Sequence, residues 1–206
     1  MSRGASASEV LGLPGRRVTS LPLPATDGRR RSLDELETRT ILFLFPGIGG
    51  PADPRHLEDW KALPGAYGCT SEACAFRDEL LALHQYVACV LGLSSQDIPR
   101  LQKAAERLRL NYPLLSDESL VVADSLGLPT FEFHGARYFE RLTLVIRDGR
   151  VEAALYPVVP PEQAAAQALE WLSGADAARL TAPKIVRPAS WSARSLTETQ
   201  PHELNR

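Results

Sequence analysis

The chain alternates between short apolar runs and amphipathic stretches, in an order that predicts strands separated by helices. Residues 39–46, RTILFLFP, form a continuous apolar run that ends at a proline, which is typical of a strand buried on both faces. Residues 86–95, YVACVLGLSS, predict a second buried strand. Between these strands, from Cys69 onwards, apolar side chains recur every three or four positions and indicate a helix with one apolar face. That face comprises Ala73, Phe76, Leu80 and Leu83.

The remaining pattern completes an α/β fold. It predicts a hairpin or paired edge strands around a Thr-Asp-Gly turn (17–36) and a helix with Asp97 at its cap and Pro99 in its first turn (97–110). An extended segment (111–119) and a short helix closed by Gly127 follow. Strands joined by His-Gly and Asp-Gly turns (130–158) and an amphipathic helix (160–172) complete the pattern. Strands separated by helices require parallel pairing, whereas hairpins add antiparallel strands. We therefore expect a mixed central sheet flanked by helices.

Three segments interrupt this periodicity and define the expected domain organisation. Residues 47–68 are dense in glycine and proline and too broken to form one element, and such a long loop inside a domain is usually functional or disordered. Beyond Gly174 the apolar periodicity is lost. We predict a flexible N-terminus (1–9), one domain (10–173) that carries the 47–68 insertion, and a C-terminal tail (174–206).

Composition and charge narrow the class of partner and the compartment. The 206 residues suit one domain, and a net charge of -2 does not favour nucleic acid or an anionic membrane as partner. The N-terminus lacks an apolar signal region, and no stretch approaches the roughly 20 apolar residues that cross a bilayer. We expect a cytoplasmic protein, in which thiols are kept reduced. Three cysteines do not suit a disulfide framework, so any disulfide would be transient and catalytic.

Two of the cysteines lie close together at the start of the first long helix, in the segment GCTSEACAFRDE (68–79). Unpaired backbone N–H groups and the helix dipole at this end favour thiolate, so we expect a lowered pKa for Cys69. Cys74 lies about 7.5 Å further along the helix axis. Because a disulfide needs α-carbons within about 7 Å, the pair cannot bond unless the first turn unwinds.

The residues alone leave three interpretations of this pair open. It is a redox couple, part of a metal site, or two small apolar residues that happen to lie close together, with Cys74 simply buried. A metal site needs further ligands, and the nearest histidines, His56 and His84, have no recognised ligand spacing. Cys89 lies within an apolar strand and is expected to be structural.

The motif resembles that of the atypical two-cysteine peroxiredoxins of the bacterioferritin-comigratory-protein type. Three segments carry the resemblance, which covers roughly residues 10–172: a strand ending in FP followed by GCTSEACAFRDE, then YPLLSDES, then RLTLVIRDGRV. It implies a thioredoxin-like fold and a thiol-dependent peroxidase acting on hydrogen peroxide or organic hydroperoxides. Cys69 would be the peroxidatic cysteine and Cys74 the resolving cysteine, while Arg141 would stabilise the thiolate and the developing oxyanion.

The resemblance also implies the partners of the reaction. A thioredoxin-like dithiol would reset the disulfide, no metal or organic cofactor would be needed, and the protein would be a monomer or homodimer. Two departures from the family pattern bear on activity. The loop before the reactive helix is much longer than in the family, and Ala66 occupies the family's hydroxyl position, with no Ser or Thr between Ile41 and Gly68. Tyr67, Thr70 or a histidine of the insertion would have to substitute.

Two other classes of function compete with a peroxidase. One is a redox sensor or partner-binding protein with weak or no turnover, and the other is a specialised thiol redox enzyme whose insertion holds a small organic substrate. The insertion carries the large side chains Trp60, Leu63 and Tyr67, which would be costly to leave bare in water. We expect them to form a wall over Cys69 or a contact surface.

Overall fold

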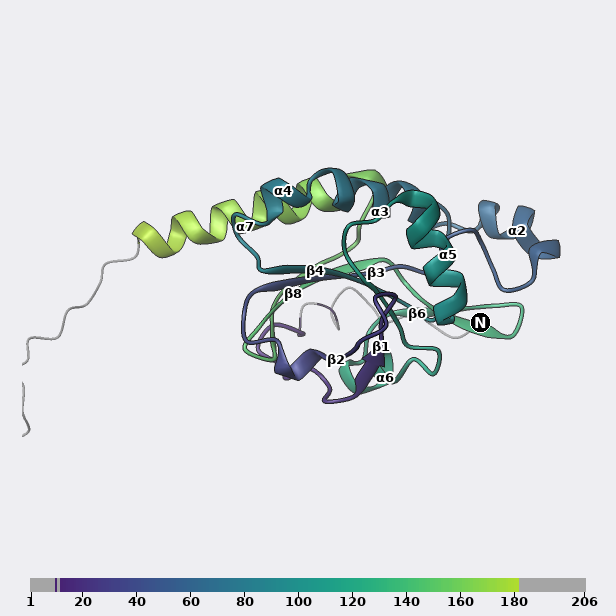
Figure 1. The fold of residues 1–206 in the computed structure, drawn as a ribbon, viewed down its shortest axis with the longest axis horizontal. Helices are drawn as coiled ribbons and strands as arrows, with labels where there is room; N and C mark the ends of the chain where they lie inside the picture. The colour runs from purple at the N-terminus through teal and green to yellow at the C-terminus, as the bar shows by residue number, and fades with distance from the viewer. Residues whose placement is uncertain (1–9, 11, 182–206) are drawn as a thin grey trace, which may run out of the picture.

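A five-stranded mixed sheet forms the centre of the structure, a computed structural model that describes residue 10 and residues 12–181 (Figure 1). The predicted flexible segment 1–9 and residues 182–206 of the predicted tail lie outside the described residues. The strand order is β5-β4-β3-β8-β9. Strands β3, β4 and β5 run parallel, whereas β8 pairs antiparallel with β3 and β9 pairs antiparallel with β8. Their bounds are β3 Thr40–Leu44, β4 Cys89–Ser94, β5 Leu114–Ser116, β8 Leu142–Arg147 and β9 Arg150–Leu155.

Strand β3 lies in the middle of the sheet and is buried on both faces, as its apolar run predicted. Successive side chains of a strand point to opposite faces. Ile41 and Phe43 accordingly join the apolar cluster on one face, and Leu42 and Leu44 join the cluster on the other. The continuous apolar run therefore reflects two separate cores that one strand divides.

Helices cover the two faces of the sheet unequally (Figure 1). One face carries α3 (Cys69–Asp78), α4 (Leu80–Leu83), α5 (Ile98–Leu108) and α7 (Ala164–Thr181). The other face packs against α6 (Val121–Leu126) and the hairpin formed by β1 (Pro22–Pro24) and β2 (Arg30–Ser32). Phe76 of α3 stacks on Phe43 with ring centroids 4.3 Å apart, which anchors the reactive helix to the central strand.

The predicted helix ends were confirmed at two positions and wrong at one. Asp97 caps α5 by accepting the backbone N–H of Arg100 at 2.8 Å, and Gly127 closes α6 with φ +63°. The last helix, however, continues through Gly174 to Thr181, so the expected boundary at 173/174 falls inside α7. Alanines sustain the helix beyond its amphipathic part, and an ion pair from Asp176 to Arg39 at 2.8 Å holds it to the domain.

The insertion is more ordered than its glycine and proline content suggested. It contains a 3₁₀ turn, η2 (Pro54–His56), which Asp53 caps by accepting the backbone N–H of Arg55 at 2.9 Å. A short helix, α2 (Leu57–Ala62), follows directly. Trp60 of α2 is only 1% exposed, because it packs against the hairpin of β6 (Thr130–Phe133) and β7 (Ala136–Phe139). Its ring centroid lies 4.8 Å from that of Tyr138. Contact with the hairpin, rather than local sequence, therefore orders the insertion.

Three further short features complete the described chain. These are the 3₁₀ turns η1 (Leu33–Glu35) and η3 (Pro161–Gln163) and the separate two-stranded sheet of β6 and β7. The His-Gly and Asp-Gly turns join β6 to β7 and β8 to β9, as predicted. None of the helices in the part of the chain that the structure describes has the length and apolar character needed to span a membrane.

Candidate active site

The reactive-cysteine motif opens helix α3, and a glycine makes this helix start possible. Gly68, the N-cap residue, has φ +99°, in the left-handed region that side chains with a Cβ disfavour. A Cβ at this position would also lie 2.6 Å from Cγ of Pro161 in η3. Gly68 therefore lets the chain turn sharply beneath η3, which places Cys69 as the first residue of the helix, as the sequence predicted.

Three groups surround the sulfur of Cys69, which is 3% exposed. The backbone N–H of Gly47, just after β3, donates to Sγ at 3.5 Å, and Nη2 of Arg141 donates to the same atom at 3.5 Å. The thiol itself donates to the carbonyl of Ala66 at 3.5 Å. The two donors face the position where negative charge forms when the thiol ionises, so they favour the thiolate.

Arg141 connects the loop, the reactive helix and the sheet. It lies immediately before β8 and is 4% exposed. Its Nη2 donates to the carbonyl of Tyr67 at 3.0 Å and to that of Gly65 at 3.3 Å, while Nη1 pairs with Oε2 of Glu72. The structure thus brings Arg141 to Cys69 although 72 positions separate them in the chain.

Glu72 is a member of this site that the sequence reasoning missed. It is fully buried in α3, and its Oε1 has no hydrogen-bond partner among the described residues. The signal was present in the motif, because a residue three positions after Cys69 lies on the same side of a helix. A charged residue on the buried side of a helix normally has a buried partner, which here is Arg141.

Burial sets the titration of both acids. Burial raises the pKa of the Cys69 thiol, with the charge of Arg141 opposing the rise and the carboxyl of Glu72 adding to it. Burial also raises the pKa of Glu72 to about 8, again against Arg141. The sequence predicted a lowered pKa for Cys69, and this prediction is wrong for this conformation. Desolvation of the thiolate outweighs the stabilisation that it gains at the helix N-terminus, and the charge of Arg141 is shared with Glu72.

A cavity of about 230 Å³ reaches Cys69 from the surface. Thr70 and Tyr67, both predicted site residues, line it, and both are exposed. Leu57 and Trp60 of the insertion form another part of its wall. Leu63 instead lines a second cavity of about 210 Å³, on the side of Arg141. Of the three side chains expected to form a wall over Cys69, Trp60 and Tyr67 line its cavity, whereas Leu63 does not. Trp60 also packs against the β6–β7 hairpin.

The site thus holds a buried thiol beside a fixed cation. Comparison with known proteins assigns the chain to a family. The AhpC/TSA family model matches residues 14–154. The chain belongs to the AhpC/TSA family.

Relatives and solved structures agree with this assignment. The chain is 30% identical over 149 residues to a putative peroxiredoxin bcp of Coxiella burnetii, an alignment that covers 70% of this chain and 88% of the relative. It is also 30% identical over 135 residues to peroxiredoxin Bcp of Escherichia coli, and this alignment covers 63% of this chain and 76% of the relative. The crystal structure of peroxidoxin BcpB from Mycobacterium tuberculosis superposes with a TM-score of 0.62 at 29% identity, over 78% of this chain and 96% of that one. The thioredoxin-like fold is confirmed.

Within this AhpC/TSA site, Ala66 takes the place of the hydroxyl that the resemblance led us to expect. Its side chain is fully buried in the cluster of Trp60 and Tyr138, away from solvent. Its carbonyl, rather than its side chain, contacts the thiol. Among the candidate substitutes, Tyr67 and Thr70 line the cavity, whereas His56 is not among its lining residues. The N–H of Gly47 is the additional donor to the sulfur, and the sequence carried no signal for it.

The second cysteine of the motif lies in the same helix as the first. Cys74 is partly buried, and all three cysteines are free thiols. Because α3 is continuous from Cys69 to Asp78, both cysteines are in wound helix. Cys89 opens β4 with its Sγ 3.8 Å from the carbonyl oxygen of Val90, and burial raises the pKa of its thiol.

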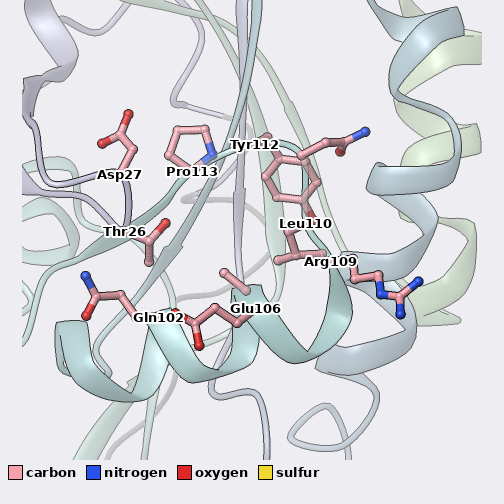
Figure 2. Close-up of a pocket in the computed structure, with 10 residues that line it drawn as sticks. Thr26, Asp27, Gln102, Glu106, Arg109, Leu110, Tyr112 and Pro113 are labelled. Atoms are coloured by element: carbon pink, nitrogen blue, oxygen red, sulfur yellow. The ribbon is translucent and has the colours of Figure 1, made fainter.

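A separate hollow on the surface of the domain is lined by none of the residues that surround Cys69. Figure 2 shows it between the Thr26–Asp27 turn and α5, with Gln102 and Glu106 on the helix facing the turn. Its volume is about 450 Å³. One lining residue, Tyr112, donates its hydroxyl to the carbonyl of Ala73 at 2.7 Å and so supports α3 from below. None of the residues that line this hollow is a cysteine, so its link to the site is the support that Tyr112 gives to α3.

Proposed function

We propose that this AhpC/TSA protein is a thiol-dependent peroxidase in which Cys69 is the peroxidatic cysteine and Cys74 the resolving cysteine. The observation that carries the proposal is the placement of Cys69 Sγ at the start of a helix with Nη2 of Arg141 3.5 Å away. A peroxide entering the 230 Å³ cavity would meet this sulfur from the side of Tyr67 and Thr70. The substrate is hydrogen peroxide or an organic hydroperoxide.

The first half of the reaction is a displacement at oxygen. The thiolate of Cys69 attacks one peroxide oxygen, the O–O bond breaks, and the second oxygen leaves with the bonding electrons as water or an alcohol after it gains a proton. The sulfur is thereby oxidised to a sulfenic acid. Arg141 and the N–H of Gly47 are positioned to hold the thiolate and the developing oxyanion, which is the electrostatic contribution of the site.

The second half regenerates the thiols. The thiol of Cys74 attacks the sulfenic sulfur, water leaves, and a disulfide forms. Because α3 is wound over both residues, its first turn must open before the sulfurs meet. An external dithiol of the thioredoxin type then reduces the disulfide. The chemistry needs neither a metal nor an organic cofactor.

The remaining expectations from the sequence stay part of this proposal. A net charge of -2 does not favour nucleic acid or an anionic membrane as the main partner. Sparse cysteines that must cycle between thiol and disulfide favour a reducing compartment such as the cytoplasm. We propose a monomer or homodimer, since the cysteine pair required for turnover lies within one chain.

Turnover measurements test the function. Purified protein is mixed with hydrogen peroxide or cumene hydroperoxide, with thioredoxin and thioredoxin reductase as the reducing system, and NADPH oxidation is followed. We expect many turnovers for the wild type, none for Cys69→Ser, and wild-type turnover for the control Cys89→Ser. Peptide mapping after one equivalent of peroxide should show a disulfide between Cys69 and Cys74 within one chain.

The same experiment separates the competing functions. In Cys74→Ser, mass spectrometry should detect a sulfenic acid on Cys69 and turnover with thioredoxin should fall. A wild-type protein that is oxidised once and does not turn over is a sensor. If Cys69 reacts with neither peroxide, the protein is neither a peroxidase nor a peroxide sensor. A thiol redox enzyme that acts on a small organic substrate is then the better hypothesis.

A further inference from the structure

Two histidines and an aspartate from distant parts of the chain meet on the surface beside the insertion. His56 ends η2, Asp59 lies one turn later in α2, and His134 lies in the turn between β6 and β7. One ligand atom from each residue can be chosen so that all three atoms lie within 4.8 Å of one another. The proposed thiol chemistry uses none of these residues.

The distances within this cluster are short. Oδ2 of Asp59 lies 3.5 Å from Nε2 of His134 and 3.9 Å from Nδ1 of His56. The imidazole rings of His56 and His134 are stacked with centroids 3.6 Å apart. Asp53 also approaches His56, at 3.9 Å, but several hydrogen bonds from Arg55 already occupy its carboxylate.

The fold holds the two segments of this cluster together independently of any ligand. Trp60, the residue after Asp59, is buried against the hairpin and contacts Phe133, the residue before His134, with ring centroids 5.2 Å apart. His56 and Asp59 are three positions apart across the start of α2 and therefore share one side of it. The side chains of His134 and Asp59 are 46% and 67% exposed, so an ion can reach them and they can reorient.

We propose that His56, Asp59 and His134 bind a divalent transition metal ion such as Zn²⁺. Imidazole nitrogen and carboxylate oxygen are ordinary Zn²⁺ ligands, and three protein ligands with water in the fourth position make a tetrahedral site. Bonds of about 2.0–2.1 Å place tetrahedral ligand atoms about 3.3 Å apart, so the side chains must close by an ångström or so. One imidazole must also rotate out of the stack, because a metal ion lies in the plane of each ring that binds it.

The bound ion would link the insertion to the β6–β7 hairpin. Leu57 and Trp60 of the same helix line the cavity above Cys69. The ion would therefore hold this wall of the cavity in place. Binding adds stability because the ligands converge only in the folded chain.

Calorimetric titration of the full, reduced protein with zinc sulfate tests the proposal. We expect one ion per chain and a raised unfolding temperature. His134→Asn and Asp59→Asn should each weaken binding by about tenfold or more. His134 has φ +47°, a conformation that asparagine also adopts readily, and the Asp59 side chain is largely exposed, so both variants should fold. The matched control, His84→Asn, should bind zinc like the wild type.

The cysteines are the competing zinc ligands, and two measurements distinguish them. The double variant Cys69→Ser/Cys74→Ser should keep wild-type zinc affinity. Co²⁺ bound to the wild type should show visible ligand-field bands without the near-ultraviolet charge-transfer band of thiolate ligands. Wild-type affinity in His134→Asn, loss of binding in the cysteine variant, a thiolate band, or no binding of Zn²⁺ at all would each overturn the proposal.

Discussion

Nη1 of Arg141 donates to the carboxyl of Glu72, a fully buried residue of the reactive helix, while Nη2 of the same guanidinium lies 3.5 Å from the sulfur of Cys69. One cation therefore serves two acids. Because both acids are buried, the ionisation of either one takes up the charge that would stabilise the other. The reactivity of Cys69 consequently depends on Glu72, which no feature of the thiol itself reveals.

The first prediction concerns this competition. Glu72→Gln removes one of the two acids and leaves Arg141 to the thiolate, so the pKa of Cys69 should fall. Iodoacetamide should therefore alkylate Cys69 faster in Glu72→Gln than in the wild type. The ratio of the two rates should grow as the pH rises through about 8, because Glu72 of the wild type ionises there and competes for Arg141. Glu79→Gln, an exposed glutamate at the end of α3, is the control. An unchanged pH profile in Glu72→Gln would contradict the shared-cation model.

The second prediction is the pH dependence of stability. The pKa of Glu72 rises from 4.5 to about 8 on folding, so the folded state binds a proton that the unfolded state has lost. This contribution to stability is present below pH 4.5 and is lost as the pH rises towards 8. In urea unfolding curves, the wild type should lose stability between pH 5 and 8 relative to Glu72→Gln, whose amide does not titrate. Parallel curves for the two proteins would show that Glu72 stays ionised in the folded state.

The third prediction concerns the geometry of Arg141. A lysine keeps the charge but cannot reach the sulfur, Glu72 and the loop carbonyls at once, because it lacks the planar fork of donors. Arg141→Lys should lower the second-order rate constant for hydrogen peroxide by about 10²–10³, the usual cost of losing an oxyanion donor. Stopped-flow tryptophan fluorescence measures this rate constant. The control is Arg107→Lys, which makes the same substitution at an exposed residue that lines the cavity. A wild-type rate in Arg141→Lys would mean that charge alone suffices.

The fourth prediction concerns the choice of peroxide. Deleting the insertion would strip the hairpin of Trp60, so a single exposed wall residue is the cleaner target. Tyr67 is 63% exposed and lines the cavity. Tyr67→Ala should shift kcat/KM towards hydrogen peroxide relative to cumene hydroperoxide, since apolar contacts of this size are worth about 1–3 kcal/mol. If the ratio of the two constants does not move, Tyr67 does not discriminate between the two peroxides.

The fifth prediction concerns the start of the reactive helix. Gly68→Ala combines a left-handed backbone with a Cβ 2.6 Å from Pro161, whereas Gly65→Ala has a similar φ of +83° and open space around its Cβ. Both variants should lose about 1–3 kcal/mol to backbone strain. Only Gly68→Ala should also slow the reaction of Cys69 with peroxide, because the helix start must shift. Equal rates in the two variants would show that the contact with Pro161 is relieved without moving the cysteine.

The sequence predicted most elements because their signals are local. The apolar run of β3, the Asp97 cap of α5 and the Asp-Gly turn between β8 and β9 each depend on a few neighbouring residues. Helix α2 and the extension of α7 were missed. Both depend on distant partners, Trp60 on the β6–β7 hairpin and Asp176 on Arg39.

In the candidate site, too, local sequence signals identified some features, and others depended on contacts between distant residues. The resemblance of the 68–79 motif and the Arg-Leu-Thr segment to a known family named Cys69, Cys74 and Arg141 as candidates. The structure brings Arg141 to Cys69. The tertiary structure alone decided how buried the thiol is, that Gly47 donates to it, and that Glu72 competes for Arg141. The physical reason is that residue type and spacing determine the chemistry a segment can perform. The pKa values and contacts of that segment depend on desolvation and on charges that reach it only when the chain has folded.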